Sequence, residues 1–209
     1  MTSSAFFQHL NGLFTWVYRL AYVTILWWMF VIVGVGVVGI FPASAAMFCV
    51  MRKWILLDPD IALFKEFCSA YKRDFLTSNI AGYSMTVIGA VLALNMHFLV
   101  MHHNAVTSIA IGWLTIVSGI YVIMFSLMFP ILAHFNLGPL AGIRYSFVLC
   151  ITSPLRSLSL LGAIMILIIA TVTIGGLVSI FFVSIIAFVV ILITYYKNPN
   201  FGKIYELRS

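Results

Sequence analysis

Charge is scarce in this sequence. Of its 209 residues, 11 are Lys or Arg and 5 are Asp or Glu, so 8% are charged whereas 64% are hydrophobic. Soluble domains carry about 25% charged residues, and a water-soluble fold could not bury this much apolar surface. The composition therefore predicts an integral membrane protein, with lipid as the solvent for most of the chain.

Other residues that are scarce or absent limit the functions that this chain can have. The three cysteines, Cys49, Cys68 and Cys150, form no C-x-x-C pair, which indicates reduced thiols rather than a disulfide framework. The apolar runs at 76–101 and 105–133 contain no Asp, Glu, Lys or Arg, which argues against an ion-coupled pump and against an enzyme that uses paired carboxylates. We expect no catalytic residues, cofactor or metal.

The basic residues lie between the apolar runs, in the pattern of membrane topology, and form no stripe with interleaved aromatics. Nucleic acid is therefore not an expected partner. Three histidines, His97, His102 and His103, lie near the end of one apolar run, and we interpret them as solvated residues of a loop rather than as metal ligands.

Five apolar runs are long enough to cross a bilayer core of about 30 Å as helices. They cover residues 21–41, 76–101, 105–133, 158–174 and 177–196. Alternate connecting segments are rich in Lys and Arg, so the positive-inside rule predicts an outside N-terminus and a cytoplasmic C-terminus. The expected fold class is an all-α membrane protein with five transmembrane helices in a single domain, residues 1–209.

Amphipathic helices are expected on the cytoplasmic side, over residues 43–57, 60–75 and 139–152. A re-entrant segment is the alternative for residues 43–57. In 60–75, apolar residues recur at helical spacing and polar residues take the other face. The predicted cytoplasmic interface, which would meet anionic lipid or a partner, consists of Arg52, Lys53, Lys65, Lys72 and Arg73.

The stretch GVGVVG, residues 34–39, has the glycine spacing of a dinucleotide-binding loop. It lies inside an unbroken apolar run, where a pyrophosphate would have no nearby cation, so we interpret the glycines as packing residues. Glycine lets a neighbouring helix approach closely in a membrane. The predicted helix-packing seam, which could also slide or hold a ligand, consists of Gly34, Gly36, Gly39, Ala43, Ala45 and Ala46.

Two amides, Asn79 and Asn95, interrupt the apolar run at 76–101. Hydrogen bonding between helices is the first interpretation of these residues. The alternative is that they line a polar path through the membrane.

Several segments in order resemble one family. VVGIFPASAAMFCVMRKW is followed by LFKEFCSAYKRDFLTSNI, then by FPILAHFNL and by SPLRSLSLLGAI. This order is similar to that of the YesL-like family of small bacterial membrane proteins, over roughly residues 15 to 196. The resemblance implies a multi-pass plasma-membrane protein of unassigned activity, often encoded beside carbohydrate ABC importers, and it transfers no catalytic residues.

The resulting hypothesis is a non-catalytic accessory partner of an ABC system for carbohydrate uptake, bound to the importer's permease subunits. The alternative is a homo-oligomeric carrier or channel for a small neutral solute. In both cases the lipid bilayer is the surrounding partner.

Overall fold

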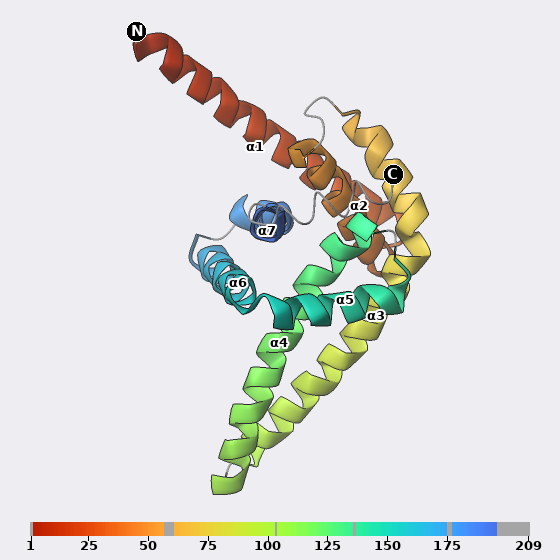
Figure 1. The fold of residues 1–209 in the computed structure, drawn as a ribbon, viewed down its shortest axis with the longest axis vertical. Helices are drawn as coiled ribbons and strands as arrows, with labels where there is room; N and C mark the ends of the chain where they lie inside the picture. Colours follow the sequence, from red (N-terminus) through yellow and green to blue (C-terminus); the bar gives the residue numbers. More distant parts are fainter. Residues whose placement is uncertain (1, 57–60, 103, 136, 175–176, 196–209) are drawn as a thin grey trace.

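The chain folds into helices, as Figure 1 shows for this computed structural model. The structure describes residues 2–56, 61–102, 104–135, 137–174 and 177–195, and these ranges contain no strand. The helices are α1 (Thr2–Val33), α2 (Val37–Leu56), α3 (Leu63–Met101), α4 (Ala105–Phe135), α5 (Pro139–Thr152), α6 (Pro154–Ile174) and α7 (Leu177–Tyr195). The predicted all-α class is confirmed over this part of the chain.

The first apolar run is two helices rather than the one that we predicted over 21–41. α1 ends at Val33, and the chain reverses through Val35 and Gly36, whose φ angles are 59° and 72°. The Gly36 N–H donates to the Val31 carbonyl at 2.8 Å and the Val35 N–H donates to the Ile32 carbonyl at 3.0 Å. This is the hydrogen-bond pattern of a Schellman helix end.

Glycine is required where the two helices meet at this reversal. A β-carbon on Gly34 would lie 2.5 Å from the Tyr71 hydroxyl of α3, and one on Gly39 would lie 2.6 Å from the Val31 carbonyl oxygen. No side chain fits at such distances without movement of the backbone. GVGVVG therefore builds a tight helix reversal.

The two helices run back along each other after the reversal. The rings of Trp16 in α1 and Trp54 in α2 lie 4.6 Å apart, and the Arg19 guanidinium lies 5.2 Å from the centre of the Trp54 ring. Arg19 is therefore at the same end of the α1–α2 hairpin as Arg52 and Lys53.

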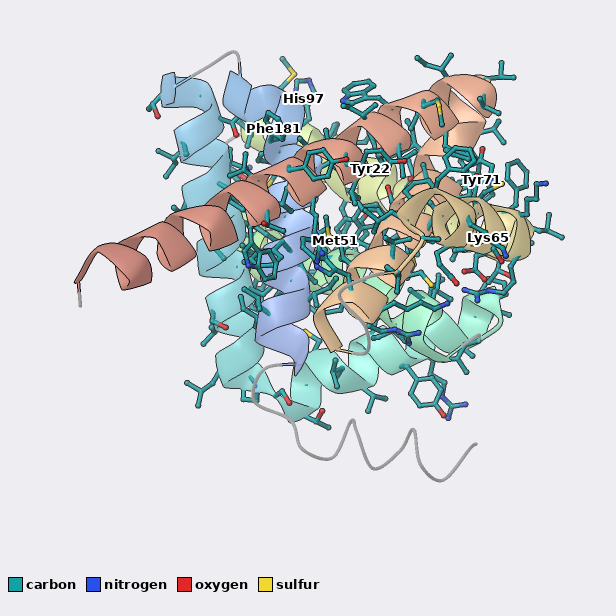
Figure 2. The ribbon with its side chains drawn as sticks, turned by 90° about the horizontal axis from the view of Figure 1, so that it is seen from above. Tyr22, Met51, Lys65, Tyr71, His97 and Phe181 are labelled. Carbon is teal, nitrogen blue, oxygen red and sulfur yellow. The ribbon has the colours of Figure 1, made fainter. Side chains whose placement is uncertain are left out.

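α2 forms the middle of the core. It packs against α1, α3, α4 and α7, and its residues from Ala45 to Met51 are almost fully buried. In Figure 2, Met51 lies toward the middle of the molecule, whereas Lys65 of α3 lies at its edge. The structure thus differs from the predicted interfacial helix at 43–57, because residues 43–51 are apolar on nearly every side and pack into the core.

α3 is one helix of 39 residues, about 58 Å long. It joins the predicted interfacial helix at 60–75 to the predicted span at 76–101. The physical reason is that residues 63–81 contain no glycine or proline, so nothing interrupts the helix where its character changes from amphipathic to apolar.

α3 and α4 form a long antiparallel hairpin whose lower half in Figure 1 extends beyond the other helices. The Asn104 side-chain oxygen accepts hydrogen bonds from the backbone of Val106 and Thr107, at 3.0 and 2.9 Å, and so caps α4 at the tip. The Tyr121 hydroxyl of α4 donates to the Met85 carbonyl of α3 at 2.8 Å. The turn between α3 and α4 lies where the predicted runs at 76–101 and 105–133 meet, although α3 begins at Leu63 and α4 ends at Phe135.

The last three helices do not continue this hairpin as parallel neighbours. α5 passes across it in Figure 1, and α6 and α7 are seen nearly end-on while α3 and α4 lie in the plane of the view. The chain bends by 103° between α5 and α6, next to Pro154. Thr24 of α1 and Ser184 of α7 hold α7 against the core through hydroxyls 2.7 Å apart.

Four described helices, α1 to α4, are long and apolar enough to cross a membrane, and there are five candidates if α5 and α6 count as one bent span. The fold is therefore consistent with an all-α membrane protein.

Replacing Gly39 by Ala should destabilise the fold by about 1–3 kcal/mol, because the new methyl group collides with the backbone of α1. Gly112→Ala is the matched control, since a β-carbon there meets nothing within 4 Å. Thermal unfolding of both variants in detergent micelles measures the difference. Equal stability of the two variants would contradict the backbone contact at the reversal.

Candidate functional site

The charged residues of the described core gather where the end of α2 meets the first half of α3. Lys53 Nζ of α2 lies 2.5 Å from Glu66 Oε2 of α3, and the two side chains are 29% and 35% exposed. This ion pair joins the two helices at the rim of the cluster. Because both groups still touch the surroundings, the pair contributes little to stability, about 0–1 kcal/mol.

A second ion pair joins two adjacent residues of α3, Arg73 and Asp74, whose side chains are 43% and 12% exposed. Arg73 donates to both carboxylate oxygens of Asp74, from Nε at 2.9 Å and from Nη2 at 2.6 Å. The same Nη2 lies 3.8 Å from the Cys49 sulfur of α2. Asp74 and Arg52 are both buried. The bidentate pair lies within α3, and it reaches α2 through the weak contact of Arg73 with Cys49.

Polar groups continue one turn further into α3. The Asn79 side-chain nitrogen donates to the Phe75 carbonyl at 3.0 Å. Within the described residues, the buried Asn79 Oδ1 and Ser78 Oγ atoms have no hydrogen-bond partner. Such groups cost about 1–3 kcal/mol each unless a water or an ion satisfies them.

The charged cluster has a structural role. Both described carboxylates of the cluster, Glu66 and Asp74, form an ion pair with a basic side chain. Over the described ranges, no three His, Cys, Asp or Glu residues come close enough to hold a metal ion. We therefore interpret the cluster as a charged lock between α2 and α3.

The predicted cytoplasmic interface divides into two groups. Lys65 and Lys72 are exposed on the outer side of α3. Arg52 is buried and Lys53 pairs with Glu66 of α3, whereas Arg73 reaches Cys49 of α2 but stays exposed. All five residues are basic, but only the tertiary structure shows which of them are buried with α2.

The predicted packing seam is also divided. Gly34, Gly36 and Gly39 belong to the reversal, whereas Ala43, Ala45 and Ala46 are fully buried in α2. The small residues thus do not form one continuous stripe along a single helix.

The two amides do not bond between helices as we expected. Asn95 donates to the Val91 carbonyl at 2.7 Å, and Asn79 likewise bonds four residues back in its own helix. They lie about 24 Å apart along α3, with Asn79 buried and Asn95 exposed. The structure therefore gives no continuous polar path between them.

The histidines stay apart. The His102 ring nitrogen lies 3.0 Å from the Phe98 carbonyl at the hairpin tip, and His97 is exposed. His103 lies outside the described residues. The reading of His97 and His102 as exposed residues fits these positions.

Sequence reasoning missed several polar links between helices, including that of Tyr121 with Met85. The Trp27 indole donates to Ser44 at 3.1 Å, the Tyr71 hydroxyl donates to the Phe30 carbonyl at 3.3 Å, and Thr24 meets Ser184. In the sequence, these links are visible only as single hydroxyl-bearing residues among apolar ones. Such a hydroxyl can equally well donate to a carbonyl of its own helix.

These features define an all-helical protein whose longest helices are apolar enough for a bilayer and whose charges are concentrated at one helix contact. Comparison with known proteins gives its family. Residues 20–96 match the family described as Protein of unknown function, DUF624. The chain is 31% identical over 173 residues to Uncharacterized protein YteU of Bacillus subtilis, which covers 83% of this chain and 78% of YteU.

Two further Bacillus subtilis proteins are similar. Uncharacterized protein YesL is 30% identical over 145 residues, 69% of this chain and 68% of YesL. Uncharacterized protein YesV is 31% identical over 122 residues, 58% of each chain. The chain belongs to the YesL-like family of uncharacterised proteins, which confirms the resemblance seen in its motifs. No solved structure matches it, and none of these names indicates a catalytic activity.

Asp74→Asn should destabilise the protein by about 1–2 kcal/mol, because Asp74 is buried and its charge-assisted contact with the partly exposed Arg73 is weakened. Glu66→Gln should cost less, about 0.2–1 kcal/mol, since its ion pair is partly exposed. Lys72→Gln, on the exposed side of α3, is the control. Thermal unfolding in one detergent ranks the three variants, and a larger loss for Glu66→Gln than for Asp74→Asn would contradict the lock.

Proposed function

We propose that the protein is a non-catalytic accessory subunit of a complex in the bacterial plasma membrane. The observation that carries the proposal is the surface of the α3–α4 hairpin. Large apolar side chains are exposed along both helices, among them Val87 and Leu94 of α3 and Trp113 and Ile116 of α4. Such a surface needs lipid or an apolar partner to cover it.

The charge distribution supports a binding role over a chemical one. The described carboxylates near the core are engaged in the α2–α3 lock. The hairpin offers shape and apolar area, which are the means by which membrane helices associate. The YesL-like resemblance supplies the kind of complex, and we propose a carbohydrate ABC importer with its permease subunits as the partner.

Affinity purification of the tagged chain from native membranes in mild detergent tests the proposal. Importer permease subunits should copurify with the unaltered chain. Trp113→Ala should reduce their recovery severalfold, because exposed aromatic residues often dominate interface energies. Tyr18→Ala on α1 is the matched control, since Tyr18 and Trp113 are 66% and 69% exposed.

Recovery of the chain without permease subunits would count against the accessory role. Solute flux into proteoliposomes that contain the purified chain alone would support the carrier or channel instead. The two hypotheses thus predict opposite results in the two assays.

We also propose that the N-terminus lies on the cytoplasmic side, together with Arg52 and Lys53. The contact of Trp16 and Arg19 with Trp54 supports this orientation, since the α1–α2 hairpin returns to the side from which it starts. The positive-inside rule favours the same side for Arg19. The sequence-based prediction of an outside N-terminus assumed that residues 21–41 form one helix that crosses the membrane once, whereas they belong to the two helices α1 and α2.

A cysteine introduced at Ser4 should therefore resist a membrane-impermeant thiol reagent added to intact cells, and Cys68 should resist it too. A cysteine introduced at Thr107, next to the hairpin tip, should be labelled. Disrupted cells give the reference for full labelling. Labelling of the Ser4 variant in intact cells would show instead that the N-terminus lies outside the cell.

A further inference from the structure

The reversal between α1 and α2 differs from an ordinary turn between helices. Residues 31–40 consist of valine, isoleucine and glycine alone, whereas turns that face water are polar. The turn between α3 and α4 is of the polar kind, with Asn104 as its cap. We call residues 31–40 the aliphatic tip, and its exposed side chains are those of Ile32, Val33, Val35, Val37, Val38 and Ile40.

The hairpin that carries this tip is shorter than the hydrocarbon core of a bilayer, which is about 30 Å thick. From Arg19 to Val33, α1 rises about 21 Å. From Val37 to Arg52, α2 rises about 23 Å. The Arg19 guanidinium packs on Trp54, so both basic residues lie at the same end of the hairpin. With that end at the level of the headgroups, the tip stops inside the hydrocarbon.

The contact with α3 gives an independent measure of depth. Phe41, which lies one turn after the reversal, packs against Gly82 of α3. Beyond Gly82, α3 continues for about 28 Å to Met101, next to the polar turn. Figure 1 shows the same difference, because the lower half of the α3–α4 hairpin extends beyond the other helices. The aliphatic tip therefore ends well short of the level that the α3–α4 turn reaches.

The backbone of the reversal is suited to hydrocarbon. Lipid offers no hydrogen bonds, so backbone groups at membrane depth need partners within the protein. The Gly34 N–H donates to the Phe30 carbonyl at 3.0 Å, and the Gly36 N–H donates to the Val31 carbonyl. The Gly39 N–H donates to the Gly36 carbonyl at 2.9 Å. These bonds supply internally what water supplies to a turn at the surface.

The side chains of the aliphatic tip favour acyl chains over a protein as their cover. Protein interfaces draw most of their binding energy from aromatic residues and arginine, and residues 31–40 contain neither. Valine and isoleucine transfer favourably into hydrocarbon at membrane depth. They also carry no polar atom that a partner could bind.

We propose that α1 and α2 form a re-entrant hairpin, and that the acyl chains of membrane lipids cover its aliphatic tip. The hairpin enters the bilayer from the side of Arg19 and Arg52 and leaves on the same side, without reaching the opposite surface. α1 and α2 then do not cross the bilayer, although each is long and apolar enough by itself. The inference does not depend on the accessory role, and it holds for either orientation of the chain.

Spin labelling of the full chain in proteoliposomes tests the depth of the tip, with Cys49, Cys68 and Cys150 first replaced by Ala. A nitroxide on Val35→Cys should collide with oxygen, which concentrates in hydrocarbon, and should be shielded from a water-soluble nickel chelate. Val106→Cys is the matched control, since Val35 and Val106 are 86% and 76% exposed at the turns of the two hairpins. Its nitroxide should show the opposite preference. Equal access of the chelate to both positions would overturn the proposal.

The cover of the tip has its own measurement. A photoreactive amino acid in place of Val35, activated in native membranes, should form adducts with phospholipid. Adducts with a second copy of the chain or with another membrane protein would show that protein covers the tip, and this result would refute the proposal. Copurification of permease subunits is a separate readout, so failure of the accessory role and failure of the re-entrant hairpin remain distinguishable.

Discussion

The close approach of α1 and α2 at Gly34 and Gly39 is the constraint on which the fold depends. With the two backbones in contact, the chain must reverse. Trp54 near the end of α2 therefore returns to the level of Trp16 and Arg19 in α1. The reversal also directs α2 through the middle of the molecule, where α1, α3, α4 and α7 surround it. A side chain at either glycine would separate these helices and open the core.

Charge and apolar surface are separated along α3. Its first half carries Glu66, Arg73 and Asp74 into the contact with α2, and its second half exposes apolar residues on the hairpin. Because α3 is continuous, the charged lock anchors a helix that projects beyond the core. A continuous, apolar projection on a charged base suits a protein that binds other membrane proteins.

Much of the outline follows from the sequence. The α3–α4 hairpin follows from two long apolar runs separated by a short polar turn, and α5 follows from Pro139 at its start. The first two helices could not be found in this way, because the reversal at Val35 and Gly36 lies inside one apolar run. Nor could the lock between α2 and α3, since basic residues near a membrane usually face headgroups, whereas Arg52 is buried with α2 and Lys53 pairs with Glu66 of α3.

The sequence by itself determined the helical class, because scarce charge and long apolar runs suit helices in hydrocarbon. The order of its motifs determined the family. The tertiary structure alone decided which apolar faces meet protein and which remain exposed. The physical reason is that core residues and lipid-facing residues have the same apolar composition, so only contacts such as Gly39 with Val31 or Tyr121 with Met85 distinguish them.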